Sequence, residues 1–404
     1  MSKESERPLP YGRQSIDDSD IAAVAQVLAG DWLTTGPAVE AFENAFAERV
    51  GAAHAVACSS GTAALHLALE ALWHAEGDHV IVPAISFLAT ANAVRFMGAE
   101  VIFADVDPET GLLTSDHAEA ALKGAAGARV KALLPVHLAG QCVDMASLKS
   151  FAKAFGLNIV EDACHALGSI VASGGERTPV GACRQSDMAT FSFHPVKAIT
   201  TGEGGMVTCA SGDIAQRLAS MRNHGMSRDA RAFQNAALAF EGEVANPWYY
   251  EMEEVGFNYR LSDIQCALGL SQLSRLDDFL AKRSALVARY EQELAELAPT
   301  VRPIARVPQC DPAWHLFVVL IDFDQIGVSR ADVMNALKAQ GIGSQVHYIP
   351  LYQQPYYRQR YGRQKLPGAE AYYARCLSLP LFPDMGQDDV VRVSSALKEI
   401  VAGG

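Results

Sequence analysis

The run Phe191-Ser192-Phe193-His194-Pro195-Val196-Lys197-Ala198-Ile199-Thr200-Thr201-Gly202-Glu203-Gly204-Gly205 places one lysine between a strand-like start and a glycine-rich return. Pro195 argues against a continuing helix, so Lys197 is expected on a tight turn or loop. Its neighbours are apolar, and burial keeps an amine available as an imine-forming nucleophile. This setting suits an aldehyde cofactor. Most lysines are ordinary surface cations, so the interpretation depends on residues elsewhere in the chain.

A carboxylate at the end of a second apolar run supports this interpretation. Asp162 closes Leu157-Asn158-Ile159-Val160-Glu161-Asp162, which is typical of a buried parallel strand. Open α/β sheets bind ligands at the carboxyl ends of such strands. There a carboxylate can accept a charge-assisted hydrogen bond from a protonated pyridine nitrogen, which keeps the ring an electron sink. Asp162 could instead cap the following helix, and only its pairing with Lys197 favours the functional interpretation.

An anion site is predicted between a strand at Ala55–Cys58 and a helix at Ala63–Leu72. Free backbone N–H groups and the helix dipole point outward from the start of such a helix. Gly61 lets a phosphate approach, Thr62 adds a hydroxyl, and Ser192 can close the cup from the lysine side. The turn alone is a weak signal, because Ser and Thr are the usual helix caps. Together with the lysine and the carboxylate, it indicates pyridoxal 5'-phosphate (PLP).

Read together, these motifs resemble the sugar aminotransferases of the DegT/DnrJ/EryC1/StrS family over nearly the whole chain. Within that family, the chain is most similar to the flagellin-modification transaminases that make UDP-4-amino-4,6-dideoxy-N-acetyl-β-L-altrosamine for pseudaminic acid. The matching stretches are Tyr11–Ile16, Ser86–Asn92, the Lys197 run, Gly256–Gln265 and Gln345–Tyr352. The 4-amino-4-deoxy-L-arabinose transaminases of lipid A modification are also similar, at Ala313–Phe317 and Leu379–Asp384.

The resemblance implies an aspartate aminotransferase-like fold (PLP fold type I) and a role for each matched residue. Lys197 would form the Schiff base with PLP, and Asp162 would pair with the pyridine nitrogen. The residues implied to hold the phosphate are Gly61, Thr62 and Ser192, with Asn258 reaching in from a neighbouring subunit.

Two further cofactor contacts and a set of substrate contacts follow from the same resemblance. Phe87 would stack on the cofactor ring, although it could also be a core phenylalanine at a strand end. His165 would bond the ring hydroxyl, or be a hydrogen-bonded core histidine. The implied substrate contacts are Tyr11, Asp31, Trp32, Leu33, Thr34, Gln345, Val346, His347 and Tyr348.

Composition limits the other classes of function. The chain has 404 residues, 50% of them hydrophobic, which is enough for a large core and more than one domain. Its 33 basic and 46 acidic side chains give a formal charge of -13, which disfavours nucleic acid and anionic membranes. The 8 cysteines show no zinc-ligand spacing and no compact disulfide pattern, so no metal site is predicted. With no secretory or membrane-spanning run, we expect a cytoplasmic protein with reduced thiols.

The order of patterns along the chain predicts an α/β fold. Strand-like runs at His79–Pro83, Val101–Asp105, Val130–Val136 and Asn158–Asp162 alternate with helical ones, which indicates a mostly parallel sheet covered on both faces. We expect a large PLP-binding domain at 1–265 and a smaller C-terminal α/β domain at 266–404. Arg228–Asn246 has no clear period and is interpreted as an irregular excursion that could reach a second subunit.

These features favour a homodimeric transaminase with shared active sites. It would move an amino group from glutamate, giving 2-oxoglutarate, to C4 of a UDP-4-keto-6-deoxy-N-acetylhexosamine. Alternatives with the same chemistry are the UDP-4-amino-4-deoxy-L-arabinose and perosamine types. A sugar dehydratase of the family would carry histidine in place of Lys197. A non-catalytic regulatory protein on the PLP fold is disfavoured by the set Lys197, Asp162 and Ser192.

Overall fold

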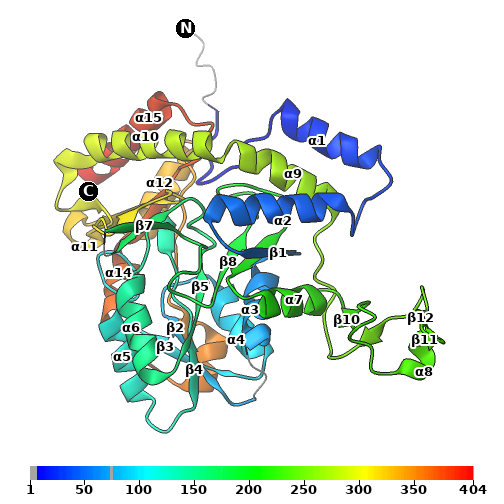
Figure 1. Ribbon diagram of the computed structural model, residues 1–404. Coiled ribbons are helices and arrows are strands. Elements are labelled where there is room, and N and C mark those ends of the chain that lie inside the picture. Colours follow the sequence, from blue (N-terminus) through cyan, green and yellow to red (C-terminus); the bar gives the residue numbers. More distant parts are fainter. Residues whose placement is uncertain (1–6, 73–75, 174, 404) are drawn as a thin grey trace.

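A mixed sheet of 7 strands forms the centre of this computed structural model, which describes residues 7–72, 76–173 and 175–403 (Figure 1). β9 runs antiparallel to both of its neighbours, and every other adjacent pair in the sheet is parallel. Across the sheet the order is β1 (His54–Cys58), β9 (Gly205–Cys209), β8 (Met188–Ser192), β5 (Asn158–Asp162), β4 (Val130–Leu133), β2 (His79–Pro83) and β3 (Glu100–Ala104). The predicted mostly parallel sheet is confirmed.

Strand boundaries follow the apolar runs closely; β1 begins one residue before the predicted Ala55, and the larger difference is at β4. β2 and β5 have the predicted bounds, and β3 is displaced by one residue. The strand expected at Val130–Val136 is shorter in the structure, where β4 ends at Leu133. Pro135 has no N–H to continue the ladder, and its carbonyl instead accepts the N–H of Asp162 at 2.8 Å.

Helices cover both faces of the sheet (Figure 1). α3 (Gly61–Leu72) packs on β1, β5, β8 and β9, between α4 (Leu88–Phe96) and α7 (Gly212–Met221). α2 (Pro37–Val50) contacts β1 from the other face, because Ala57 packs with Phe42 and Phe46 while its neighbours Val56 and Cys58 belong to the cluster on the α3 side. The remaining elements of this part are α1 (Asp18–Leu28), α5 (Ser115–Gly124), η1 (Leu138–Gly140) and α6 (Met145–Phe155).

The C-terminal part is built on an antiparallel sheet of 3 strands, in the order β14, β16 and β17. Its long helix α10 packs against α15 and β14. A second small sheet joins β6, β7 and β15. The bounds are α9 (Asp263–Ser274), α10 (Leu276–Leu294), η2 (Ala295–Leu297), β14 (Val301–Pro303), β15 (Cys310–Asp311), β16 (Phe317–Ile321), α11 (Phe323–Ile326), α12 (Arg330–Ala339), η3 (Leu351–Gln353), α13 (Pro355–Tyr361), α14 (Pro367–Arg375), β17 (Cys376–Leu379), α15 (Gln387–Ala402), β6 (Ile170–Ser173) and β7 (Glu176–Pro179).

Two contacts bear on the proposed domain division. A boundary after residue 265 falls inside α9, which begins with a capping box between Ser262 and Gln265. The N-terminal segment lies against the C-terminal part, since Leu9 N–H donates to Gly341 O at 2.9 Å. The division at 265 stays a prediction.

The segment after α7 extends away from the rest of the molecule (Figure 1). Its elements are β10 (Met226–Ser227), α8 (Ala236–Ala239), β11 (Phe240–Glu241), β12 (Val244–Ala245) and β13 (Glu251–Met252). We call residues 228–255 the excursion. Short two-stranded ribbons hold it together, which agrees with the irregular pattern of its sequence.

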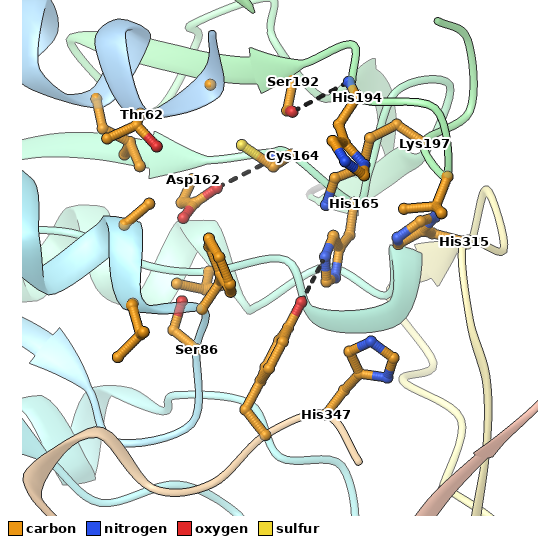
Figure 2. Close-up of a pocket in the computed structure, with 18 of the residues that line it drawn as sticks. Thr62, Ser86, Asp162, Cys164, His165, Ser192, His194, Lys197, His315 and His347 are labelled. Carbon is orange, nitrogen blue, oxygen red and sulfur yellow. Dashed lines mark hydrogen bonds between the residues drawn. The ribbon is translucent and has the colours of Figure 1, made fainter. Parts of the chain in front are cut away.

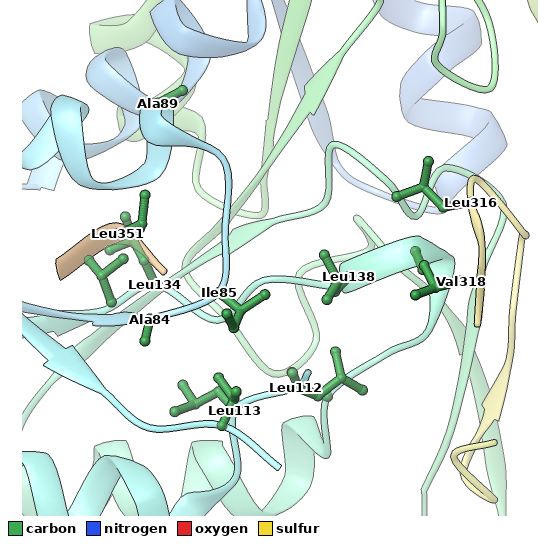
Figure 3. Packing of buried hydrophobic residues seen from close by; sticks show 14 of the residues in the cluster. Ala84, Ile85, Ala89, Leu112, Leu113, Leu134, Leu138, Leu316, Val318 and Leu351 are labelled. Atoms are coloured by element: carbon green, nitrogen blue, oxygen red, sulfur yellow. The ribbon is translucent and has the colours of Figure 1, made fainter. Parts of the chain in front are cut away.

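Close packing fixes the backbone beneath the sheet's carboxyl edge. Ala84 and Ile85 follow β2 and are fully buried, next to Leu134 and Leu351 (Figure 3). Leu351 N–H also donates to Ala84 O at 2.8 Å, which ties the C-terminal part to this edge. A fully buried side chain of this kind contributes roughly 1.5–3 kcal/mol. Within the described ranges, no helix has both the length and the apolar character needed to span a membrane.

Candidate active site

The loop between β8 and β9 carries Lys197 into a cavity (Figure 2). Lys197 N–H donates to His194 O at 2.8 Å, and Thr201 N–H donates to Phe193 O at 3.0 Å. These bonds close the tight turn that Pro195 predicts. Burial lowers the pKa of Lys197, although nearby Cys164 and Asp162 oppose the shift. The loop therefore presents an amine that loses its proton more readily than a surface lysine.

Asp162 lies at the carboxyl end of β5, buried and facing the same cavity. Its backbone is held by Pro135 O and by His137 N–H, which donates to Asp162 O at 3.1 Å. Its carboxylate takes the Cys164 N–H on Oδ1 at 3.2 Å and the Thr90 hydroxyl on Oδ2 at 2.7 Å. The position suits a charge-assisted bond to a cationic heterocyclic nitrogen.

The turn between β1 and α3 has the form of an anion cup. Ser60 Oγ accepts the N–H of Ala63 at 3.1 Å and Ser60 O accepts that of Ala64 at 2.9 Å. In the described part of the chain, no acceptor engages the amides of Gly61 and Thr62. A Cβ on Gly61 would lie only 2.7 Å from Ser192 Cβ, so the glycine lets the two sides of the cup meet. Open amides at a helix N-terminus fit the phosphate of PLP.

Neutral imidazoles form the far wall of the cavity (Figure 2). His165 Nδ1 accepts the Ala139 N–H at 3.3 Å, so its Nε2 carries the proton and donates to the Tyr348 hydroxyl at 3.2 Å. The His315 ring lies 4.3 Å from that of His165, measured between centroids. Burial lowers the pKa of both rings well below the usual value, with Lys197 adding to the effect. Burial likewise lowers the pKa of His347 to about 3.

Most of the predicted site residues line this one cavity of about 540 Å³. Phe87 stands at its mouth, 54% exposed, with its ring 6.0 Å from that of Tyr348. His165 forms a hydrogen bond with Tyr348. That bond is compatible with both predicted roles of His165, as a contact to the ring hydroxyl of the cofactor and as a hydrogen-bonded core histidine. The predicted residues that line the cavity are Tyr11, Gly61, Thr62, Phe87, Asp162, His165, Ser192, Lys197, Gln345, Val346, His347 and Tyr348.

The other predicted contacts lie outside this cavity. Asp31, Trp32, Leu33 and Thr34 precede α2, and Asn258 precedes α9. Thr34 bridges to Ser262, and Asn258 bridges to Asn223. Trp32 is 57% exposed, so its side chain is open to a partner. None of the five lines the 540 Å³ cavity of this same chain.

Sequence reasoning assigned no role to several residues that line or support the cavity. Cys164, His194, Glu203 and His315 line it, and Thr90 bonds Asp162 from outside the cavity lining. His315 and Thr90 both lie in stretches that carry the family resemblance. Their partners are distant in sequence, so no local pattern pointed to their contacts.

Comparison with known proteins agrees with the fold, which is that of the PLP fold type I enzymes. The model of the DegT/DnrJ/EryC1/StrS aminotransferase family matches residues 14–398. The spore coat polysaccharide biosynthesis protein SpsC of Bacillus subtilis (strain 168) is 39% identical over 400 residues, which cover 98% of this chain and 97% of that protein.

Solved structures show the same likeness. Helicobacter pylori PseC, an aminotransferase involved in the biosynthesis of pseudoaminic acid, has a TM-score of 0.87 and 28% identity, with 98% of this chain and 100% of that chain covered. The PLP form of the putative sugar aminotransferase Spr1654 from Streptococcus pneumoniae has a TM-score of 0.84 and 27% identity, covering 98% and 99%. The chain therefore belongs to the DegT/DnrJ/EryC1/StrS aminotransferase family and is a sugar aminotransferase whose cofactor is PLP.

The buried histidines make stability depend on pH. Because His347 has a pKa of about 3 in the folded chain, the unfolded chain binds the extra proton as pH falls below 6.5. The free energy of unfolding therefore falls as the pH drops below 6.5. For this histidine the loss is about 2 kcal/mol at pH 5. Thermal unfolding of the apoprotein between pH 7.5 and 5 should show the loss, and His347→Gln should flatten the curve. The same substitution at exposed His54 is the control, and an equal flattening there would contradict the assignment.

Proposed function

We propose that this aminotransferase moves an amino group from glutamate to C4 of a UDP-4-keto-6-deoxy-N-acetylhexosamine, giving UDP-4-amino-4,6-dideoxy-N-acetyl-β-L-altrosamine. The observation that carries the proposal is the single cavity in which Lys197, Asp162 and the open amides of the β1–α3 turn meet. Tyr11 and Gln345–Tyr348 line the same cavity, beside the place where the amino group would be exchanged. The fold's likeness to PseC supports the choice of sugar.

The chain's own groups suggest how each step is served. When bound, PLP supplies a carbonyl carbon that takes up the amino group and a pyridine ring that withdraws electrons. Gly61, Thr62 and Ser192 would hold its phosphate, and Asp162 would hold its ring nitrogen protonated. Lys197 Nζ would bind it at rest. Once displaced, the same Nζ is the base that moves the proton at the reacting carbon, and its lowered pKa suits that task.

The charge of the cavity bears on the substrate and on assembly. Of the described residues that line it, Lys197 is the only lysine or arginine. A nucleotide diphosphate is anionic, and the chain as a whole carries a formal charge of -13. A substrate diphosphate would therefore depend on neutral donors of this cavity or on groups from outside it, because the one buried amine is committed to the cofactor.

We also propose a homodimer with shared sites, in which a second copy of the chain completes each cavity. Neither Asn258 nor residues 31–34 line the cavity of their own chain, as expected for groups that serve a neighbour. The excursion adds exposed apolar side chains suited to burial against a partner. They are Leu238, Val244, Trp248, Met252 and Val255, between 62% and 78% exposed.

One relative supports an alternative substrate. The 39% identity to SpsC, named for spore coat polysaccharide biosynthesis, favours an amino sugar of a surface polysaccharide. The UDP-4-amino-4-deoxy-L-arabinose and perosamine types belong to this alternative. A regulatory protein without turnover is disfavoured by the complete set Lys197, Asp162 and Ser192 in one cavity. We place the enzyme in the cytoplasm, where nucleotide sugars are made.

The choice of substrate is tested with a panel of keto sugars. Purified enzyme with glutamate should aminate the UDP-4-keto-6-deoxy-N-acetylhexosamine with the largest kcat/KM. The UDP-4-keto pentose and the dTDP- and GDP-4-keto-6-deoxy hexoses serve as competitors, with 2-oxoglutarate release as the readout. A higher kcat/KM for any competitor would replace the proposed sugar but keep the aminotransferase.

The cofactor lysine is tested by chemical trapping. The holoenzyme should be yellow, and borohydride should fix PLP irreversibly on Lys197, as peptide mass mapping would show. Lys149, which donates its Nζ to Arg184 O on the exterior, is the internal control. Label on any lysine other than Lys197 would overturn the assignment.

Shared sites predict complementation between two inactive variants. Lys197→Ala and Asn258→Ala should each be impaired alone, since one lacks the amine and the other weakens the partner's phosphate cup. In a mixed dimer, one of the two sites draws an intact lysine and an intact asparagine from different chains. Activity should therefore return after co-refolding, while each variant refolded alone stays low. Mixed dimers without recovery, or a monomeric active enzyme, would contradict the model.

A further inference from the structure

Two buried hydroxyls next to Asp162, one of them on Ser86 in the cavity lining, have no role in the function proposed so far. Ser86 follows β2 and Thr90 lies in the first turn of α4; they are 2% and 0% exposed. Thr90 Oγ1 lies 2.7 Å from Asp162 Oδ2, and Ser86 Oγ lies 2.6 Å from Thr90 Oγ1. The three side chains form one hydrogen-bonded row that runs from the start of α4 to the end of β5.

The direction of this row follows from counting protons. A carboxylate can only accept hydrogen bonds, so the single hydroxyl proton of Thr90 must point to Asp162. Thr90 Oγ1 is then free to accept, and Ser86 donates to it. Both bonds run towards the negative charge, and hydrogen bonds arranged in this way polarise and strengthen one another.

The row also fixes how the carboxylate is turned. Oδ2 is held by Thr90 from α4, and Oδ1 is held by the Cys164 N–H from the loop after β5. Donors on both oxygens from two different elements leave the group no freedom to rotate. Asp162 still lines the cavity, so its oxygens keep acceptor capacity towards a bound ring (Figure 2).

The backbone that carries the hydroxyls is itself rigid. Ala84 and Ile85, just before Ser86, are fully buried, and Leu351 N–H clamps Ala84 O at 2.8 Å (Figure 3). Thr90 N–H donates to Phe87 O at 3.3 Å, at the start of α4. The hydroxyls are therefore held in place before any ligand arrives, as preorganised support requires.

We propose that Thr90, backed by Ser86, is a positioning residue that orients the Asp162 carboxylate towards the pyridine nitrogen and keeps it a strong acceptor. The inference rests on the proposed role of Asp162. It assigns the Ser86–Thr90 pair to the electronic control of the cofactor, beyond simple pairing of buried polar groups.

The test compares Thr90→Val, which keeps the shape but removes the hydroxyl, with Thr90→Ser, which restores it. At metal sites, loss of a group that hydrogen-bonds a ligating side chain typically costs 10- to 100-fold in affinity or activity, and we take this as the scale for Asp162. Thr90→Val should therefore slow the single-turnover half-reaction with glutamate by about 10- to 100-fold. Thr90→Ser should stay close to wild type, and Ser86→Ala should fall between the two.

A spectroscopic readout separates positioning from mere packing. With PLP labelled with 15N at the ring, the bound nitrogen in Thr90→Val should shift towards the value of the unprotonated pyridine, and Ser86→Ala should shift it less. In an Asp162→Asn background, Thr90→Val should add little further loss, because its effect acts through the carboxylate. Thermal unfolding of each apoprotein shows whether the variant folds.

Distinct outcomes overturn the inference and the function beneath it. The inference fails if Thr90→Val leaves the nitrogen signal as in wild type, or if it slows the Asp162→Asn enzyme as much as it slows the wild type. In either case the Ser86–Thr90 pair would serve packing alone. If Thr90→Val does not fold, an unchanged nitrogen signal in Ser86→Ala decides against the proposal in the same way. If wild type and Asp162→Asn give the same signal, the proposed role of Asp162 itself fails.

Discussion

One contact between three strands holds the site together. Gly205, the first residue of β9, pairs with Cys58 at the end of β1 on one side and with Ser192 at the end of β8 on the other. A Cβ at this position would lie 2.3 Å from Ser60 O, so only glycine lets the strands close. Because β9 runs against its neighbours, the loop that precedes it must return to the carboxyl edge of the sheet. The lysine loop and the anion cup meet there for this reason.

The site works by directed hydrogen bonds more than by fixed charge. Burial lowers the pKa of His165, His315 and His347 and so keeps these imidazoles neutral, and the Tyr348 hydroxyl is kept protonated because burial raises its pKa well above the usual value. Removing these groups from water makes each charged form costly. The Lys197 amine and the Asp162 carboxylate are the buried charged groups beside them. These neutral groups surround the amine and the carboxylate on one side of the cavity.

Local sequence was sufficient for the parts of the fold that lie within one stretch of chain. The apolar run to Asp162, the turn at Gly61 and the proline-broken loop around Lys197 each specify their own geometry, and β2 and β5 have the predicted bounds. β4 was predicted three residues too long, because an apolar pattern does not register the missing N–H of Pro135. The family resemblance pointed to Gln345–Tyr348, which line the cavity and which no local pattern singles out.

What the sequence determined by itself was the chemistry: an amine on a loop, a carboxylate at a strand end and an open helix N-terminus, each set by neighbouring residues. Only the tertiary structure decided which side chains meet. Thr90 reaches Asp162 across 72 residues, His315 packs on His165, and Asn258 and residues 31–34 are kept away from their own cavity. These contacts depend on how helices and sheet pack over long separations. Packing of that kind follows from the shape of the whole core and leaves no periodic mark on the chain.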